Sequence, residues 1–186
     1  MLKQALRTKY KALRNNLSSE QVQALSLTIS NKLLEIPIWS YSYYHIFLSA
    51  TTKNEIDTSF ILSILQGKDK NVVVPKVATD HSFLNYLLTD TILFKENQWG
   101  IPEPIEGIEV PTQHIEVVFL PLLAFDIYGN RVGYGKGYYD NFLQQCNPSV
   151  LKIGLSFFAA EPLISDLRGG DIPLDYGVTP DKIYTF

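Results

Sequence analysis

Apolar residues near the start of the chain follow a helical period. They recur three or four positions apart at Leu2, Leu6, Tyr10 and Leu13. This pattern predicts a helix over residues 2–15 that buries one apolar face. A second helix is expected to begin at Ser18, where residues 18–21 read Ser-Ser-Glu-Gln as in a capping box, and to end before Pro37. Its expected buried stripe is Val22, Leu25, Ile29 and Leu33.

Continuous apolar runs then alternate with short helical segments. The runs predict strands over residues 43–49, 71–77, 82–88, 116–125 and 151–157, with a short terminal strand near 182–186. Helices are predicted over residues 58–66 and from residue 138 onward. Such alternation is typical of a largely parallel sheet that helices cover on both faces. The sequence therefore predicts a single α/β domain over residues 1–186, with three α/β/α layers and a mostly parallel, mixed, Rossmann-like sheet.

Charge and cysteine content exclude several classes of protein. The net charge of −3 provides no basic field for nucleic acid or an anionic membrane. No apolar run approaches the roughly 20 residues of a membrane span. The one cysteine, Cys146, cannot form a disulfide within the chain and is expected to be a small buried hydrophobe. We therefore expect a cytoplasmic protein with small-molecule partners.

Candidate chemistry is concentrated in residues 120–143, where an apolar run leads through a glycine-rich loop into a helix. The loop glycines alternate with other residues: Gly133, Gly135 and Gly137. Glycines let backbone N–H groups approach anionic oxygens, while Arg131 and Lys136 supply charge and donors. Asp140 is a hard oxygen ligand of the kind that magnesium prefers. In open α/β sheets, ligands bind at the carboxyl ends of strands, where this loop and Glu55 are expected.

Two common phosphate-binding loops do not match this segment. A Walker A loop requires glycine where Asn130 stands and Ser or Thr where Gly137 stands. The kinase and dinucleotide patterns require a glycine where Tyr138 stands. Glycine spacing alone therefore leaves a phosphate loop and a purely structural strand-to-helix turn equally open.

A longer motif favours the phosphate loop over the purely structural turn. Residues 129–140, GNRVGYGKGYYD, resemble the signature G-x-R-[LV]-G-x-G-x-G-Y-Y-D of 5-formyltetrahydrofolate cyclo-ligases, also called methenyltetrahydrofolate synthetases. Further matches occur in the family's order at Lys3 and Arg7, residues 54–58, Val74 and Pro75, residues 99–104, and Asp171, Asp175, Val178 and Thr179. The resemblance covers essentially the whole chain. It implies a monomeric enzyme that cyclises 5-formyltetrahydrofolate with ATP and Mg²⁺.

The resemblance also implies residue roles. It implies an ATP site formed by Lys3, Arg7, Arg131, Val132, Gly133, Tyr134, Gly135, Lys136, Gly137, Tyr138 and Tyr139. Of these, Arg131, Lys136 and Tyr138 are expected to be catalytic. It implies a folate site formed by Leu48 or Ala50, Glu55, Trp99, Tyr134, Gly135, Lys136, Gly137 and Tyr138. The magnesium ligands it implies are Asp140 and Asp171, although the chain departs from the family's Pro-x-Glu-x-His-Asp run before Asp171.

Several bland alternatives stand beside these roles. Without the resemblance, Lys3 and Arg7 fit a solvated helix face. Trp99 suits either an aromatic folate wall or the core, and Asp126 is expected to be a turn former rather than a cavity residue. For the whole chain, the alternatives are a non-catalytic nucleotide- or folate-binding protein and a sugar-phosphate or acyl-carrier enzyme on a similar sheet.

Overall fold

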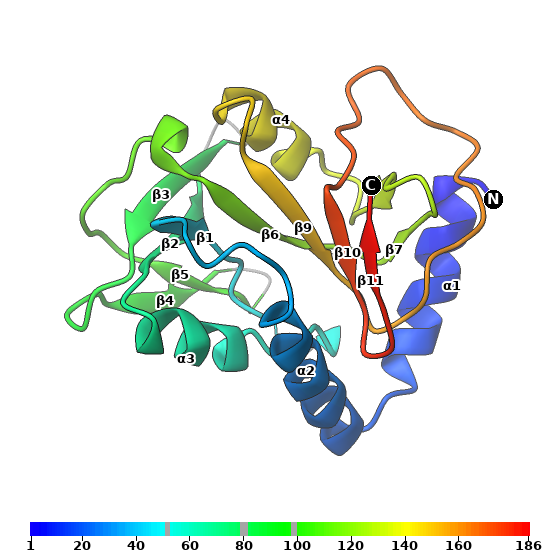
Figure 1. Ribbon diagram of the computed structural model, residues 1–186, viewed down its shortest axis with the longest axis horizontal. Helices are drawn as coiled ribbons and strands as arrows, with labels where there is room; N and C mark the ends of the chain where they lie inside the picture. The colour runs from blue at the N-terminus through cyan, green and yellow to red at the C-terminus, as the bar shows by residue number, and fades with distance from the viewer. Residues whose placement is uncertain (51–52, 79–81, 98–99) are drawn as a thin grey trace.

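The computed structural model describes residues 1–50, 53–78, 82–97 and 100–186, which form a seven-stranded sheet with flanking helices (Figure 1). The strand order is β11-β10-β9-β6-β1-β2-β3. Its members are β1 (Tyr43–His45), β2 (Asn71–Val77), β3 (Phe83–Leu87), β6 (Val117–Pro121), β9 (Leu151–Leu155), β10 (Tyr176–Val178) and β11 (Ile183–Thr185). The strands from β10 to β2 pair in parallel, whereas β11 and β3 pair antiparallel at the two edges. The predicted mostly parallel α/β sheet is confirmed.

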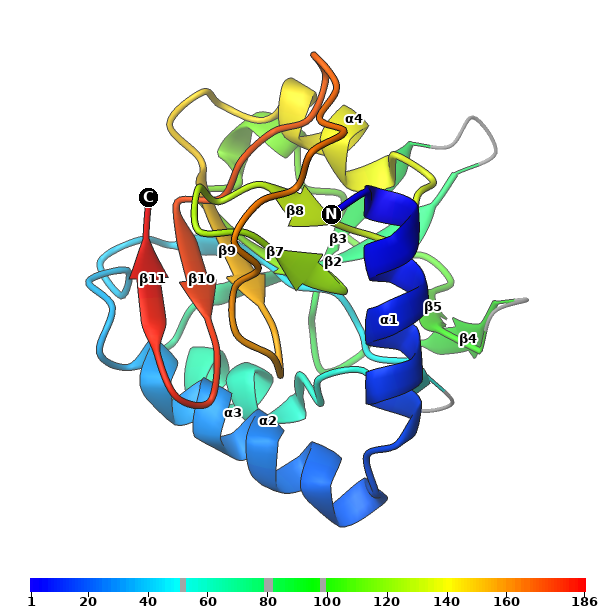
Figure 2. The same ribbon diagram turned by 90° about the vertical axis from the view of Figure 1, so that its right-hand side faces the viewer.

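Helices cover both faces of this sheet. Helices α2 (Ser19–Leu33) and α3 (Ser59–Gly67) lie on one side, and α4 (Tyr138–Gln145) lies on the other (Figure 2). Successive strand residues point to opposite faces. Val72 and Val74 accordingly join the core beneath α2 and α3, whereas Val73 joins the core beneath α4. Because both faces are buried, the central strands read as continuous apolar runs rather than alternating ones.

The second helix begins as the sequence predicts. The Ser18 hydroxyl accepts a hydrogen bond from the Gln21 N–H at 3.2 Å, and the Gln21 side chain accepts one from the Ser18 N–H at 2.9 Å. This reciprocal capping box satisfies two N–H groups that the helix itself cannot pair. In the predicted stripe, Ile29 and Leu33 are fully buried, and Val22 and Leu25 pack partly buried against the same core.

The first helix differs from the predicted orientation. Helix α1 (Lys3–Asn15) leaves Leu2 and Leu13 at 58% and 38% exposure. Its buried residues are Lys3, Leu6, Tyr10 and Arg14. The apolar pair in this set, Leu6 and Tyr10, packs in a small core with Leu123 and Val132. The helix therefore buries the cations Lys3 and Arg14, which the pattern of apolar residues could not predict.

The predicted strand over residues 116–125 is wrong in its second half. Strand β6 ends at Pro121, which has no N–H to continue the ladder. Residues further on form β7 (Ala124–Phe125), which pairs with β8 (Arg131–Val132) in a separate ribbon. The tight turn between them is made by Asp126, whose buried carboxylate accepts N–H bonds from Tyr128 and Asn130 at 3.0 Å. This confirms Asp126 as a turn former.

Other elements also differ from the sequence prediction. The first strand is shorter than predicted, since β1 ends at His45. A ribbon of β4 (Phe94–Glu96) and β5 (Pro102–Pro104), a 3₁₀ turn at η2 (Thr112–His114) and strand β10 have no counterpart in the predicted elements. None of the helices in the described part of the chain has the length and hydrophobicity needed to cross a bilayer.

The chain order of the strands defines where a ligand can enter. From β1 the chain builds outward through β2 to β3 on one side, and from β6 through β9 to β11 on the other. Strands β1 and β6 are therefore neighbours at which the chain changes direction across the sheet. A crevice opens at such a switch point, beyond the carboxyl ends of the strands. Helix α1 and the β7–β8 ribbon lie at this end of β6.

Candidate active site

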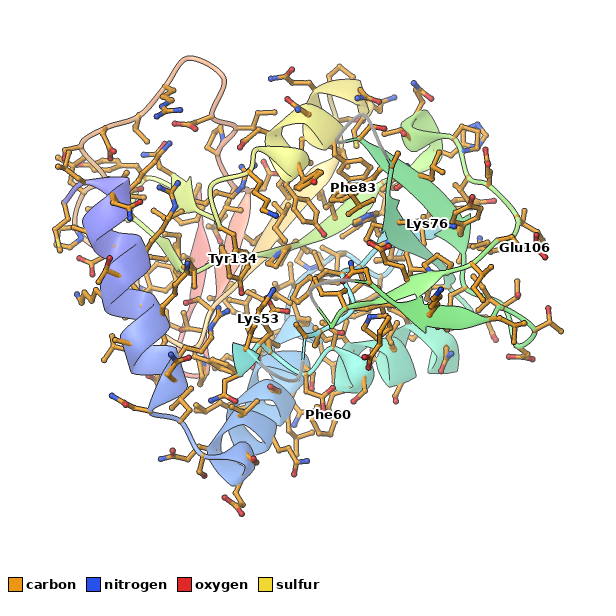
Figure 3. The ribbon with its side chains drawn as sticks, turned by 180° about the vertical axis from the view of Figure 1, so that it is seen from behind. Lys53, Phe60, Lys76, Phe83, Glu106 and Tyr134 are labelled. Carbon is orange, nitrogen blue, oxygen red and sulfur yellow. The ribbon has the colours of Figure 1, made fainter. Side chains whose placement is uncertain are left out.

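A cavity of about 600 Å³ opens at this switch point. Its volume is within the range that accommodates small-molecule ligands, about 300–1,000 Å³. The wall is built from α1, from the segments that follow β1 and β6, from the β2 and β3 edge, and from the glycine loop before α4. Figure 3 shows three of its lining residues, Lys53, Phe83 and Tyr134, from the side opposite to Figure 1. Cavity and loop thus coincide, as expected from the sequence.

The glycine loop has a backbone that two of its glycines require. Gly135 and Gly137 adopt φ values of +97° and +76°, in the left-handed region that side chains disfavour. A Cβ on Gly135 would also lie 3.2 Å from the Arg7 guanidinium carbon. Gly137 is the N-cap of α4, so the helix begins at Tyr138 as predicted. The Arg7 Nε donates to the Gly133 carbonyl at 2.9 Å and fixes the loop against α1.

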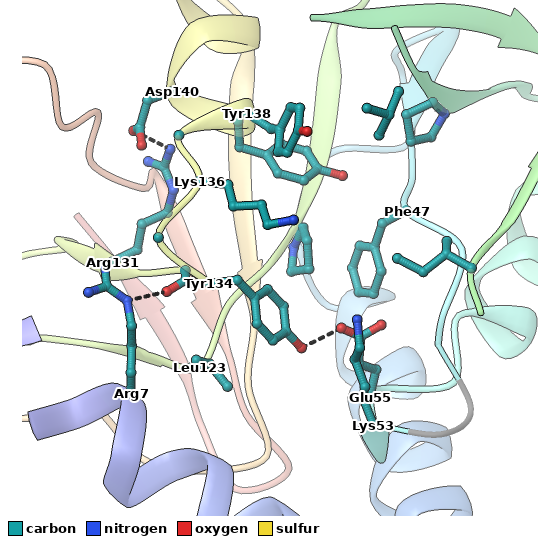
Figure 4. A pocket seen from close by; sticks show the side chains of 18 of the residues that line it. Arg7, Phe47, Lys53, Glu55, Leu123, Arg131, Tyr134, Lys136, Tyr138 and Asp140 are labelled. Carbon is teal, nitrogen blue, oxygen red and sulfur yellow. Dashed lines mark hydrogen bonds and ion pairs between the residues drawn. The ribbon is translucent and has the colours of Figure 1, made fainter. Parts of the chain in front are cut away.

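At one end of the cavity, a buried arginine holds Asp140. The Arg131 Nη2 lies 2.6 Å from Asp140 Oδ1 (Figure 4). The Nη1 atom of Arg131 donates to the Ile172 carbonyl. The Ile172 N–H donates to the same Asp140 oxygen at 3.3 Å. Burial lowers the pKa of Arg131, and the charges of Asp140 and Asp171 oppose this effect. Arg131 therefore ties the start of α4 to the segment before β10.

A second ion pair stands at the same end. Lys3, which is buried on α1, pairs with Asp171, and the Arg168 N–H donates to that carboxylate at 2.6 Å. Burial would raise the pKa of Asp171, but these hydrogen bonds and the charges of Lys3 and Arg131 hold it below its usual value. Asp140 and Asp171 thus both line the cavity, and each is paired with a cation.

Two carboxylates are too few for a closed metal site. No group of three or more His, Cys, Asp or Glu side chains in the described part of the chain could hold a metal ion. Magnesium is usually held by one or two carboxylates together with substrate phosphates and water, rather than by a closed protein cage. The contacts above use one oxygen of each carboxylate. The donor set is therefore compatible with magnesium brought in with a phosphate.

The other end of the cavity holds a further acid, Glu55. It is buried, and its two oxygens accept from the Tyr134 hydroxyl and, at 2.8 Å, from the Ala50 N–H. The Arg14 Nη1 donates to the Tyr134 oxygen at 2.7 Å. Burial, reinforced by the negative charge of Glu55, raises the pKa of Tyr134, so this phenol remains protonated. Figure 4 shows Lys136 pointing from the loop into the space between Tyr134 and Tyr138.

Comparison with known proteins establishes the family. A sequence model of the 5-formyltetrahydrofolate cyclo-ligase family matches residues 1–159. The chain belongs to this family. It is 32% identical over 179 residues to the 5-formyltetrahydrofolate cyclo-ligase of Haemophilus influenzae. This match covers 92% of the chain and 94% of that protein. It is 28% identical to the Escherichia coli protein of the same name, with 92% and 96% covered.

Solved structures of methenyltetrahydrofolate synthetases have the same fold. The structure from Aquifex aeolicus superposes with a TM-score of 0.84 at 30% identity. The match covers 100% of this chain and 93% of the Aquifex aeolicus chain. The structure from Mycoplasma pneumoniae gives a TM-score of 0.76 at 25% identity, covering 96% and 98%. The family resemblance and the fold class inferred from the sequence are therefore confirmed.

Most of the site residues expected from the cyclo-ligase family line the cavity. They are Lys3, Arg7, Leu48, Glu55, Arg131, Gly133, Tyr134, Gly135, Lys136, Gly137, Tyr138, Tyr139, Asp140 and Asp171. Two do not line it. Val132 is fully buried in the core beside α1, and Ala50 is buried behind Glu55, to which it offers only its N–H. Of the two open alternatives, Leu48 is therefore the one that faces the cavity. Trp99 lies outside the described residues.

The structure adds cavity residues that the motif does not include. Arg14 and Lys11 extend the Lys3 and Arg7 series along α1, and Lys53 precedes Glu55. The signal for Lys11 and Arg14 was in the sequence, since positions 3, 7, 11 and 14 share one helix face. Phe83 had no such signal. It stacks on Tyr138 with ring centroids 5.6 Å apart and an interplanar angle of 15°, because the β2–β3 pairing brings it there.

Proposed function

We propose that this protein converts 5-formyltetrahydrofolate and ATP into 5,10-methenyltetrahydrofolate, ADP and phosphate. The observation that carries the proposal is one cavity with two chemically different ends. One end gathers cations and paired carboxylates around a glycine loop, and the other holds a buried acid beside aromatic and apolar walls. The first end suits a triphosphate, and the second suits a heterocycle with hydrogen-bond donors on its edge.

At the phosphate end, three cations from two segments can share the charge of ATP. Lys3 and Arg7 lie one helical turn apart on α1, and Lys136 extends from the loop. Phosphoryl transfer needs little covalent help from a protein, because positioning and charge neutralisation supply most of the catalysis. Asp140 and Asp171 would hold Mg²⁺ together with phosphate oxygens, and the bound ion would neutralise further phosphate charge. The ion pairs with Arg131 and Lys3 would fix these carboxylates in place.

At the folate end, Glu55 would orient the pterin. An ionised carboxylate has about four acceptor positions. The Tyr134 hydroxyl and the Ala50 N–H occupy one position on each oxygen. The remaining positions can accept two parallel N–H bonds from the guanidine-like edge of the ring. Tyr138, which stacks on Phe83, and the cavity residue Leu48 would provide apolar contact for the flat heterocycle.

The proposed reaction has two steps, which take place with both substrates bound in this cavity. The formyl oxygen attacks the γ-phosphorus, the bond to the bridging oxygen breaks, and ADP leaves. The neighbouring aminobenzoyl nitrogen then attacks the activated formyl carbon and loses its proton to solvent. The bond between the former formyl carbon and the phosphorylated oxygen then breaks, and phosphate is released. The carbon remains as the methenyl bridge between the two nitrogens. No protein nucleophile is needed, so the residues contribute by holding the two reactants in line.

A direct assay tests this function. Purified protein with 5-formyltetrahydrofolate, ATP and Mg²⁺ should develop the near-ultraviolet absorbance of the methenyl product and release ADP in equal amount. Reactions without ATP, and with a matched inactive folate, serve as controls. Saturable binding of both ligands without turnover would instead identify a non-catalytic binding protein. Turnover of a phosphorylated sugar or acyl substrate without a pterin would also refute the proposal.

We also propose that the whole chain acts as one domain and as a monomer in the cytoplasm. The seven-stranded sheet, which takes strands from β1 to β11, supports the first point. The lone cysteine cannot form a disulfide within the chain, which is compatible with a reducing compartment. Light scattering of the active protein tests the monomer, and fractionation of source cells tests the location.

A further inference from the structure

A buried arginine near the end of α1 connects three segments of the cavity wall. Arg14 is 6% exposed. Its Nη1 donates to the Tyr134 hydroxyl at 2.7 Å, and its Nη2 donates to the Leu122 carbonyl at 2.7 Å. The helix, the break between β6 and β7, and the glycine loop therefore meet at one guanidinium. The planar fork of arginine can satisfy two acceptors in fixed directions, which a lysine ammonium cannot do as well.

We propose that Arg14 is a positioning residue that sets the Tyr134–Glu55 pair for folate binding. This inference rests on the proposed function, because it assigns the pair to the pterin. Arg14 acts through Tyr134, since the hydrogen bonds run from Arg14 to the Tyr134 oxygen and from the Tyr134 hydroxyl to Glu55. Its role is therefore distinct from that of Lys3, Arg7 and Lys136, to which the proposed function assigns contacts with ATP.

The Arg14 guanidinium determines the direction of both hydrogen bonds, from Arg14 to Tyr134 and from Tyr134 to Glu55. A guanidinium has only donors, so the Tyr134 oxygen must accept from Arg14. The single phenolic hydrogen then remains for Glu55. Hydrogen bonds in such a series polarise one another. The phenol consequently holds one Glu55 oxygen in place while the Ala50 N–H holds the other at 2.8 Å. The unused acceptor positions of the carboxylate are fixed relative to the cavity.

A second connection links the same helix end to the Glu55 segment. The Asn54 side-chain amide donates to the carbonyls of Arg14 and Leu17, at 3.1 Å and 3.0 Å. Asn54 itself has a φ of +45°, a conformation that asparagine tolerates better than most residues. The last turn of α1 thus holds the backbone before Glu55 directly and its carboxylate through Tyr134. One helix end determines both the place and the orientation of the acid.

Arg14 also connects the two halves of the site. Arg7 holds the Gly133 carbonyl at 2.9 Å, and Arg14 holds the side chain of the next residue, Tyr134. Both cations project from α1, so the start of the glycine loop is held at two adjacent residues by one rigid element. A loosened Arg14 contact is expected to affect the folate end first, because the Arg7 contact with the loop remains.

The experiment compares Arg14→Met, Arg14→Lys, Tyr134→Phe and the double variant Arg14→Met/Tyr134→Phe. Equilibrium binding of 5-formyltetrahydrofolate is measured by calorimetry, and KM is measured separately for folate and ATP. Circular dichroism checks that each variant is folded. Lys9→Met is the matched control, because Lys9 is on the same helix but pairs with Glu161 at 2.6 Å, and neither residue lines the cavity.

Arg14→Met is expected to raise the folate Kd and KM by roughly 10- to 100-fold, as expected for losing a charged hydrogen bond to a buried partner. The KM for ATP should change by less than about threefold. Arg14→Lys should recover part of the folate affinity. In the Tyr134→Phe background, Arg14→Met should add less than about threefold to the folate Kd, because the two residues act in series.

Three results would overturn the inference: unchanged folate affinity in folded Arg14→Met, an equal rise in both KM values, or the full Arg14→Met penalty in the Tyr134→Phe background. If Arg14→Met does not fold, Arg14→Lys carries the test, and unchanged folate affinity in it overturns the inference. A parent protein that does not bind 5-formyltetrahydrofolate overturns the proposed function as well. If the parent binds and converts 5-formyltetrahydrofolate, and folded Arg14→Met has the same folate Kd and KM as the parent, only the role of Arg14 is overturned.

Discussion

Replacement of Asp140 by asparagine separates its structural role from its proposed metal role. The Arg131 side chain is 8% exposed and lies 2.6 Å from Asp140, whose own side chain is 33% exposed. Asparagine keeps an oxygen acceptor and loses only the charge. The difference between a charged and a neutral hydrogen bond is about 1 kcal/mol, so Asp140→Asn should lower Tm by about 2–4 °C. Asp140→Ala should cost more, roughly 3 kcal/mol, because it removes the acceptor from a buried cation.

The effect on turnover should be larger than the effect on stability. Without a cation between them, the Asp140 carboxylate would repel a triphosphate. It is therefore expected to be useful only with Mg²⁺, and Asp140→Asn should lose most turnover at low Mg²⁺ and recover partly as Mg²⁺ rises. Asp171→Asn should show the same pattern more weakly. The assay is initial rate of methenyl product across a Mg²⁺ titration, after thermal unfolding has confirmed that each variant is folded.

The exposed Asp181, which does not line the cavity, provides the matched charge control. Asp181→Asn should follow the parent at every Mg²⁺ concentration. If Asp140→Asn also followed the parent, while its Tm fell as expected, Asp140 would be only the partner of Arg131 and the metal assignment would be refuted.

Three further predictions concern other parts of the molecule. Lys136→Ala should weaken ATP use by about 2–4 kcal/mol of transition-state stabilisation, measured as kcat/KM for ATP, with folate binding as the control. Glu55→Gln should mainly raise the folate KM, and a change in ATP affinity alone would refute the placement of the pterin. Burial lowers the pKa of His45 from 6.5 to about 3, so the unfolded chain binds a proton that the folded protein excludes between these values. Stability should therefore fall as pH drops below about 6.5, by at most about 1.4 kcal/mol per pH unit from this group, and denaturant unfolding of His45→Gln should lack that contribution.

Local sequence signals were sufficient for much of the fold. The capping box at Ser18 identified the start of α2, and the apolar runs identified the central strands, because capping and burial on both sheet faces depend on nearby residues. The twelve-residue motif of the glycine loop identified the family, and the positive φ values of Gly135 and Gly137 explain why glycine stands at those positions.

The orientation of α1 could not be read in this way. Its apolar residues predicted a buried face containing Leu2 and Leu13, yet both are exposed. The helix instead buries Lys3 and Arg14, whose partners are Asp171, Tyr134 and the Leu122 carbonyl. These partners lie more than 100 residues away in sequence. A buried cation is favourable only when such partners are present, so its position depends on the whole fold.

Long-range pairing also decided the composition of the cavity. The sequence determined the order of the elements, the glycine loop and most of the residues expected to bind ligand. Tertiary structure alone placed Phe83 against Tyr138, turned the chain out of the sheet after Pro121, and brought Arg14 to the Tyr134–Glu55 pair. The physical reason is that periodicity and capping report on neighbours within a few residues, whereas strand order and ion pairs depend on contacts between segments that only the folded chain brings together.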